Sequence, residues 1–79
     1  VHVLVVSKKH TPDVAHAAQD LTDPQLAACL RTCAKVAEDL GLTEGGYRIV
    51  NNCGENACQT VKHIHFHVLG GEKLSERMA

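Results

Sequence analysis

The sequence predicts an α+β domain in which one main helix packs on one face of an antiparallel sheet. Apolar residues recur at helical spacing through residues 22–41, the clearest helix signal in the chain. Residues 1–6 are almost continuously apolar, and residues 61–69 alternate with the two-residue period of a strand. Residues 47–51 form a shorter strand candidate. A helix with one apolar stripe and a sheet with one apolar face bury both by packing together.

The composition indicates one small domain, residues 1–79, because 79 residues allow one domain at most. A net charge of −1 gives no general attraction to nucleic acid, and no apolar run approaches the length of a membrane span. We therefore expect no nucleic-acid partner and no membrane partner. Four cysteines without a CxxC pair are compatible with a secreted disulfide framework. Cys29 and Cys33, however, look like small buried residues of the helix, so we favour reduced thiols and a cytoplasmic location.

The apolar run at residues 1–6 predicts a strand that is covered on both faces, with His2 on the same face as Leu4 and Val6. The chain begins inside this run at Val1, without a preceding cap, so we expect a fragment of a larger domain. Residues 7–20 have the composition of a loop, with one short helical turn around residues 14–17.

The main helix has recognisable signals at both ends. Thr22 precedes Gln25 by three residues, which is a capping-box pattern, and Pro24 falls in the first turn, where its missing N–H is not needed. Gly41 fits the position just after a helix C-terminus. After the strand candidate 47–51, the polar residues 52–56 favour a sharp turn.

Three histidines alternate along the strand candidate 61–69, so His63, His65 and His67 are expected on one face. Neutral imidazole is nucleophilic near neutral pH, which suits covalent nucleotidyl transfer. One ring nitrogen must present its lone pair while the other donates its proton to a fixed acceptor, for which a backbone carbonyl of the same strand is suitable. In the preceding loop, Asn52, Gln59 and Thr60 supply neutral donors for a phosphate that gains charge in the transition state, and the bend at Gly54 can turn backbone N–H groups inward.

The segment from Asn52 to His67 resembles the signature of the histidine triad family, which is HxHxH flanked by hydrophobic residues. Its order of Asn, a small residue and Gln before the triad is also similar. Residues 1–10 and 39–48 resemble the purine nucleoside phosphoramidase branch, and the likeness runs from residue 1 to about Gly71. The resemblance implies a histidine-triad domain that lacks its N-terminal portion.

The resemblance also implies a role for each histidine of the motif. His65 matches the nucleophile that forms a covalent nucleotidyl-histidine, and His67 matches a hydrogen-bond donor to a phosphate oxygen. His63 is implied to act through its backbone carbonyl, which holds the His65 ring in the reactive tautomer. His2 is implied to lie beside the phosphate site.

In the loop, the resemblance implies that Asn52 contacts the nucleotide and that Thr60 contacts the α-phosphate or the leaving group. With Gln59, these residues are expected to bind nucleotide and phosphate. Cys58 stands where the branch usually has a glycine close to the phosphate, so its exposed thiol is expected to narrow the site or make it sensitive to oxidation. The tail 72–79 lacks the aromatic and proline ending of many relatives.

The resemblance thus implies a nucleotide-binding hydrolase of the purine nucleoside phosphoramidase type. Such an enzyme cleaves P–N or phosphoanhydride bonds to the α-phosphate of adenosine or guanosine monophosphate derivatives, needs no cofactor and forms a homodimer through the helix at 22–41 and its neighbouring strand. Two alternatives stay open: a zinc-binding module built on the three histidines, and a nucleotide-binding protein without turnover. Zinc titration distinguishes the zinc-binding module from the enzyme. Trapping a modified histidine distinguishes the enzyme from a nucleotide-binding protein without turnover.

Overall fold

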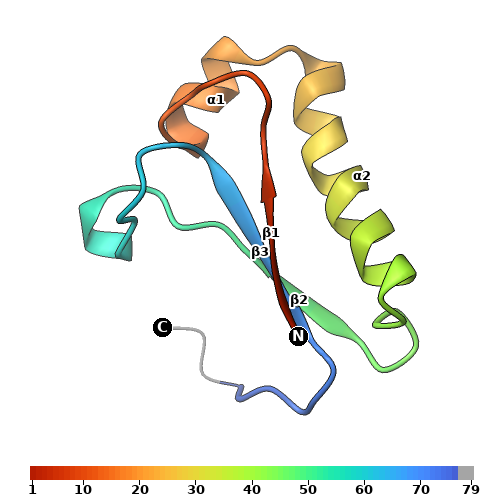
Figure 1. The fold of residues 1–79 in the computed structure, drawn as a ribbon. Helices are drawn as coiled ribbons and strands as arrows, with labels where there is room; N and C mark the ends of the chain where they lie inside the picture. Colours follow the sequence, from red (N-terminus) through yellow and green to blue (C-terminus); the bar gives the residue numbers. More distant parts are fainter. Residues whose placement is uncertain (77–79) are drawn as a thin grey trace.

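The computed structural model describes residues 1–76, so the last part of the tail 72–79 lies outside the described residues. The elements follow in the order β1 (His2–Val6), α1 (Val14–Asp20), α2 (Asp23–Asp39), β2 (Tyr47–Val50), the 3-10 turn η1 (Glu55–Ala57) and β3 (His65–Gly70). The three strands form one antiparallel sheet, and both helices pack on the same face of it, because Phe66 of β3 packs against the buried residues of both; Figure 1 shows the arrangement of these elements. The predicted α+β class, with its long helix packed on an antiparallel sheet, is confirmed.

The strand that carries the histidines is the central one, because the order across the sheet is β1-β3-β2. β1 pairs antiparallel with β3 and sets Leu4 opposite His67 and Val6 opposite His65. On the other side, Val50 of β2 lies opposite His67. Hydrogen bonds to a neighbour along both edges hold this strand more firmly than an edge strand would be held.

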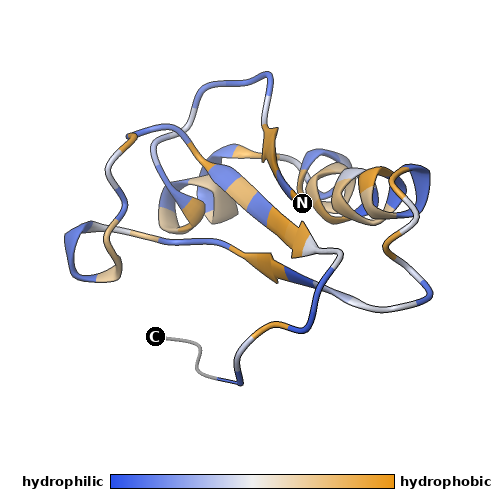
Figure 2. Cartoon of the chain, turned by 60° about the horizontal axis from the view of Figure 1, so that its bottom comes forward, coloured by the Kyte–Doolittle hydropathy of each residue, from blue (hydrophilic) through white to orange (hydrophobic). Residues whose placement is uncertain are grey.

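The two faces of the sheet have different surroundings. Residues that lie directly opposite each other on paired strands point to the same face. The helix-covered face carries Val5 and Val68, which are buried with Cys33 and Ala37 of α2. The opposite face carries the histidines, and Figure 2 shows the resulting alternation of hydrophilic and hydrophobic residues along β3.

The expectation that the first strand is covered on both faces is wrong for the described part of the chain. Leu4 is 53% exposed and Val6 is 55% exposed, although Val5 between them is buried. The reason is that α1 and α2 supply a packing layer on one side of the sheet only. Within residues 1–76, the face that carries His2, Leu4 and Val6 is open.

α2 begins and ends where its sequence signals predict. Thr22 Oγ1 accepts a hydrogen bond from the Gln25 backbone N–H, and the Gln25 side chain accepts one from the Thr22 N–H, so the capping box is complete. Pro24 lies in the first turn, and Gly41 adopts a φ of +74° just after the helix. Capping of this kind satisfies N–H groups that have no partner within the helix.

The helix α1 is longer than the single turn predicted at residues 14–17. Asp13 caps its N-terminus by accepting a hydrogen bond from the His16 backbone N–H at 2.8 Å. Ala17 is fully buried and packs with Leu21 and Ile64. The composition of residues 7–20 did not indicate the full helix, because its stability comes more from the burial of Ala17 than from intrinsic helix propensity.

β3 is shorter than the predicted strand 61–69, because residues 61–63 form bends and the strand begins at His65. Its partner β1 ends at Val6, which pairs with His65, so residues 61–63 have no opposite residues in β1 with which to pair. All four cysteines are free, and Cys29 and Cys33 are buried in the helix as expected. Across residues 1–76, no helix is both long and apolar enough to cross a membrane.

Candidate active site

Three imidazole rings meet on the open face of the sheet, from β1 and β3. The ring centroids of His65 and His67 lie 5.2 Å apart, and those of His2 and His67 lie 4.9 Å apart. Nε2 of His2 is 2.7 Å from Nδ1 of His67, which is hydrogen-bond distance. The expected neighbourhood of His2, His65 and His67 is therefore present.

A backbone carbonyl determines the tautomer of His65. Its Nδ1 lies 2.8 Å from the carbonyl oxygen of His63, and since a carbonyl only accepts, Nδ1 carries the proton. In the neutral ring, Nε2 then holds the lone pair. The carbonyl oxygen of His65 itself accepts a hydrogen bond from Asn51 Nδ2 at 2.8 Å, a contact that no pattern in the sequence indicates.

The ring of His63 is directed to different partners from those of His65 and His67. Its Nε2 lies 2.8 Å from the carbonyl oxygen of Ser7, and its Nδ1 lies 2.9 Å from Nδ1 of His10. The structure therefore brings the rings of His65 and His67 together, whereas the ring of His63 contacts His10 and Ser7 instead. The strand period does not extend back to His63, because the chain bends before β3 begins.

The surroundings of His67 favour its neutral form. Partial burial lowers the pKa of His67 below its ordinary value of 6.5, and the nearby rings of His2 and His65 lower it further. A neutral imidazole has one donor and one acceptor nitrogen. The His67 ring can therefore accept a hydrogen bond from His2 at one nitrogen and donate one to a ligand at the other.

The loop between β2 and β3 bends tightly next to the histidines. Gly54 has a φ of +84° and precedes η1, and Cys58 follows with a φ of +65°, in the left-handed region that side chains rarely adopt. The Cys58 side chain and that of Thr60 are exposed. Asn52 is half-buried, and its Nδ2 donates to the carbonyl oxygen of Ala57 at 2.8 Å, which holds the loop closed.

Gln59 does not offer the free donor that the sequence predicted. Its side chain is 5% exposed, and its Oε1 accepts from the Gly54 N–H at 2.8 Å. Its Nε2 donates to the carbonyl oxygens of Pro12 and Val61 at 2.6 and 3.0 Å. We therefore correct its assignment from a phosphate-binding residue to a buried residue that fixes the loop.

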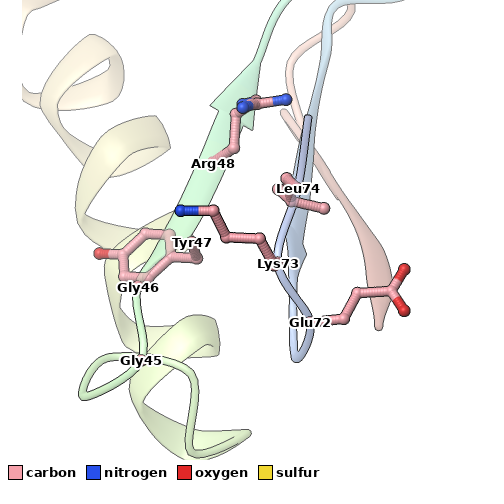
Figure 3. Close-up of a pocket in the computed structure, with 7 residues that line it drawn as sticks. All are labelled: Gly45, Gly46, Tyr47, Arg48, Glu72, Lys73 and Leu74. Atoms are coloured by element: carbon pink, nitrogen blue, oxygen red, sulfur yellow. The ribbon is translucent and has the colours of Figure 1, made fainter. Parts of the chain in front are cut away.

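The residues that line two surface hollows next to the loop before β2 include none of these histidines. One of about 210 Å³ opens beside the start of β2 (Figure 3). It is lined by Gly45, Gly46, Tyr47, Arg48, Glu72, Lys73 and Leu74. In the described part of the chain, no group of three His, Cys, Asp or Glu side chains is placed to share a metal ion. The geometry therefore gives no support to the zinc alternative.

A model of the HIT domain matches residues 1–74, nearly the whole chain. The chain belongs to the HIT domain family. A HIT-like protein of Azospirillum brasilense is 40% identical over 73 residues, which cover 92% of this chain and 60% of the relative. A second HIT-like protein, from Rickettsia prowazekii, is 34% identical over 94% of this chain and 62% of its own length. The chain therefore spans about three fifths of the length of these HIT relatives.

Solved structures of HIT proteins share the fold. A HIT family hydrolase from Clostridium thermocellum superposes with a TM-score of 0.85 at 39% identity, covering all of this chain and 68% of its own. A HIT family hydrolase from Legionella pneumophila Philadelphia 1 gives a TM-score of 0.89 at 37% identity, covering 96% of this chain and 67% of its own. The resemblance stated from the sequence is thus confirmed at the level of family and fold.

Proposed function

We propose that this protein is a nucleotide-binding hydrolase that cleaves the bond to the α-phosphate of purine nucleoside 5′-phosphoramidates, with His65 as the nucleophile. The observation that carries the proposal is the 2.8 Å contact between His65 Nδ1 and the His63 carbonyl oxygen. It leaves a lone pair on Nε2 of a ring that lies on the open face of the sheet. The hydrolase description of the solved relatives supports the same reaction class.

The proposed reaction has two displacements at phosphorus. In the first, the His65 Nε2 lone pair forms a bond to the α-phosphorus, and the amine leaves with the electron pair of the P–N bond and takes up a proton from solvent. In the second, water attacks phosphorus, releases a proton and returns the P–N electron pair to Nε2. The products are a nucleoside 5′-monophosphate and a free amine. Covalent catalysis divides one difficult step into two easier ones.

In this proposal, His67 stabilises the negative charge of the phosphate by a hydrogen bond, and His2 orients the His67 ring. When His2 donates through Nε2 to His67 Nδ1, the neutral His67 ring carries its proton on Nε2 and can donate it to a non-bridging oxygen. A donor that is already oriented stabilises the charge that develops in the transition state at little cost in reorganisation. The lowered pKa of His67 keeps the ring in this neutral form near pH 7.

The loop contributes the remaining contacts of the proposal. The exposed Thr60 hydroxyl is assigned to the α-phosphate or the leaving group, and Asn52 to the nucleotide through its side-chain oxygen. Cys58 has an exposed, free thiol in this loop, and the proposal assigns it a place next to the phosphate. Gln59 takes part only through the loop shape that it maintains.

We extend the proposal to assembly and location: a cytoplasmic homodimer that binds an adenosine or guanosine monophosphate derivative. α2 exposes Leu30, at 57%, and the outer edge of β2 has no partner strand within residues 1–76. Both features favour pairing with a second copy. Sedimentation of the full chain, compared with a Leu30→Glu variant, tests this part separately from the chemistry.

The activity is tested by incubating the full chain with adenosine 5′-phosphoramidate and measuring adenosine monophosphate by chromatography. The proposal expects product formation that disappears in His65→Asn. Nucleotide binding without product in the unsubstituted protein would favour the alternative without turnover. A product rate that is unchanged in His65→Asn would remove His65 from the role of nucleophile.

A further inference from the structure

We infer that His10 is a positioning residue, which acts through the ring of His63 to hold the His63 carbonyl against Nδ1 of His65. The inference deepens the proposed function and rests on it for its consequence in catalysis, although its structural part does not depend on turnover. It starts from the contact between Nδ1 of His10 and Nδ1 of His63 at 2.9 Å.

His63 needs such support because the sheet does not hold it. The ladder between β1 and β3 ends at the pair of Val6 and His65, and His63 lies in a bend just before it. Residues inside a ladder have their carbonyl direction fixed by the neighbouring strand, whereas a bend leaves that direction to local contacts. The carbonyl that sets the His65 tautomer is therefore oriented by something other than strand pairing.

The His63 ring is held at both of its nitrogens. Nε2 lies 2.8 Å from the Ser7 carbonyl oxygen, which only accepts, so Nε2 carries the proton. In the neutral ring, Nδ1 is then an acceptor, and the hydrogen bond at this nitrogen requires His10 to donate through its own Nδ1. His10 is thus assigned a defined proton position, and any side chain that replaces it must supply a donor there.

The peptide group that links His63 to Ile64 is held from the same segment of chain. Its N–H donates to the carbonyl oxygen of Thr11 at 2.8 Å, and its carbonyl accepts from His65 Nδ1. Because a peptide group is planar, fixing the N–H and the adjacent side chain also fixes the direction of the carbonyl. Residues 7–11 therefore orient the acceptor of His65 through three hydrogen bonds, of which one comes from a side chain, that of His10.

Two variants of the full chain separate the donor from the rest of the residue. His10→Ala removes the donor, and His10→Asn keeps an amide N–H near the position of Nδ1. His16→Ala is the matched control, because His16 of α1 is also exposed and hydrogen-bonded but pairs with Asp13, the N-cap residue of that helix. The readouts are the ¹⁵N chemical shifts of the His65 ring, which report its tautomer, and kcat and Kd for the nucleotide substrate.

For His10→Ala we expect a larger fraction of His65 protonated at Nε2 and a kcat lower by roughly tenfold to a hundredfold, the range typical of lost orienting partners. Kd should change less than about threefold, because His10 has no assigned contact with the ligand. His10→Asn should restore both the tautomer and kcat, and His16→Ala should leave both unchanged.

An unchanged His65 tautomer in His10→Ala would overturn the inference, as would an asparagine variant that is as impaired as the alanine variant in both readouts. If His10→Ala does not fold, the asparagine variant decides alone: native ring shifts support the donor role and altered shifts contradict it. A protein that never turns over nucleotides would defeat the proposed function, whereas the ring shifts would still test His10.

Discussion

Nδ1 of His65 donates its proton to the carbonyl oxygen of His63, two residues earlier in the chain, at 2.8 Å. The acceptor belongs to the backbone, so it cannot change its protonation state with pH. The rings of His67 and His2 are instead linked to each other, nitrogen to nitrogen at 2.7 Å. The site thus combines one ring of fixed tautomer with a pair whose proton can lie on either partner.

We predict that His67 titrates below 6.5 and His16 above it. Burial lowers the pKa of His67, whereas the hydrogen bond to Asp13 raises the pKa of His16. In the window between its lowered pKa and 6.5, folded His67 binds fewer protons than the unfolded residue, so its contribution to the free energy of unfolding rises with pH. The stabilisation from His16 is complete below 6.5 and is lost as pH rises past its folded pKa.

An NMR titration of the imidazole carbons measures both transitions in one experiment. Assignment by single substitutions, His67→Gln and His16→Gln, identifies each resonance. We expect the midpoint of the His67 titration to lie at a lower pH than that of His16. The reverse order would show that the burial and ring neighbours of His67 do not dominate its titration.

We predict opposite stability changes for the same substitution at two threonines. Within residues 1–76, Oγ1 of Thr11 is fully buried without a hydrogen-bond partner, so Thr11→Val removes an unsatisfied polar atom at nearly constant shape. It should raise the free energy of unfolding by about 1 kcal/mol. Thr22→Val removes the capping oxygen of α2 and should lower it by about 1 kcal/mol.

Thermal melts of both variants against the unsubstituted chain provide the comparison, with an expected shift of Tm of roughly 5 °C in each direction. Each variant serves as the control for the other, because both exchange a hydroxyl for a methyl group. A loss of stability in Thr11→Val similar to that in Thr22→Val would indicate that the Thr11 hydroxyl has a partner, such as an ordered water.

We predict that turnover is insensitive to chelators. In the proposed reaction, the phosphate charge is met by the His67 imidazole and the Thr60 hydroxyl, and no metal ion is required. Rates measured with and without excess EDTA should agree within experimental scatter. A rate that falls with chelator and returns on addition of zinc would favour the metal-binding alternative instead.

The sequence predicted the parts of the fold that depend on local signals. The capping box of Thr22 and Gln25 and the stop at Gly41 located α2 closely, because caps act over a single turn. The α1 helix was underestimated, since its stability comes from burial of Ala17 against Ile64, a contact across 47 residues of chain that no local pattern encodes.

The site was predictable where it follows the strand period and not where it depends on loop geometry. The nearness of His65 and His67 follows from alternation along β3. That of His2 was implied only by the family resemblance, and the structure produces it through the register of β1 with β3. The departure of the His63 ring, the burial of Gln59 and the contacts of His10 and Asn51 arise from chain segments that meet only after folding. Contacts between irregular segments that are distant in sequence cannot be predicted from a periodic pattern of residues.

The central claim is that Nε2 of His65 becomes covalently attached to the α-phosphorus. Its most direct test is rapid quenching of the full chain with adenosine 5′-phosphoramidate, followed by mass spectrometry of the peptide that contains residues 63–69. We predict an adenylyl adduct on His65 that forms at least as fast as turnover. The adduct should be absent in His65→Asn, whose nucleotide Kd should lie within about tenfold of that of the unsubstituted protein. Turnover at an undiminished rate in His65→Asn, or an adduct located on His63 or His67 instead, would contradict it.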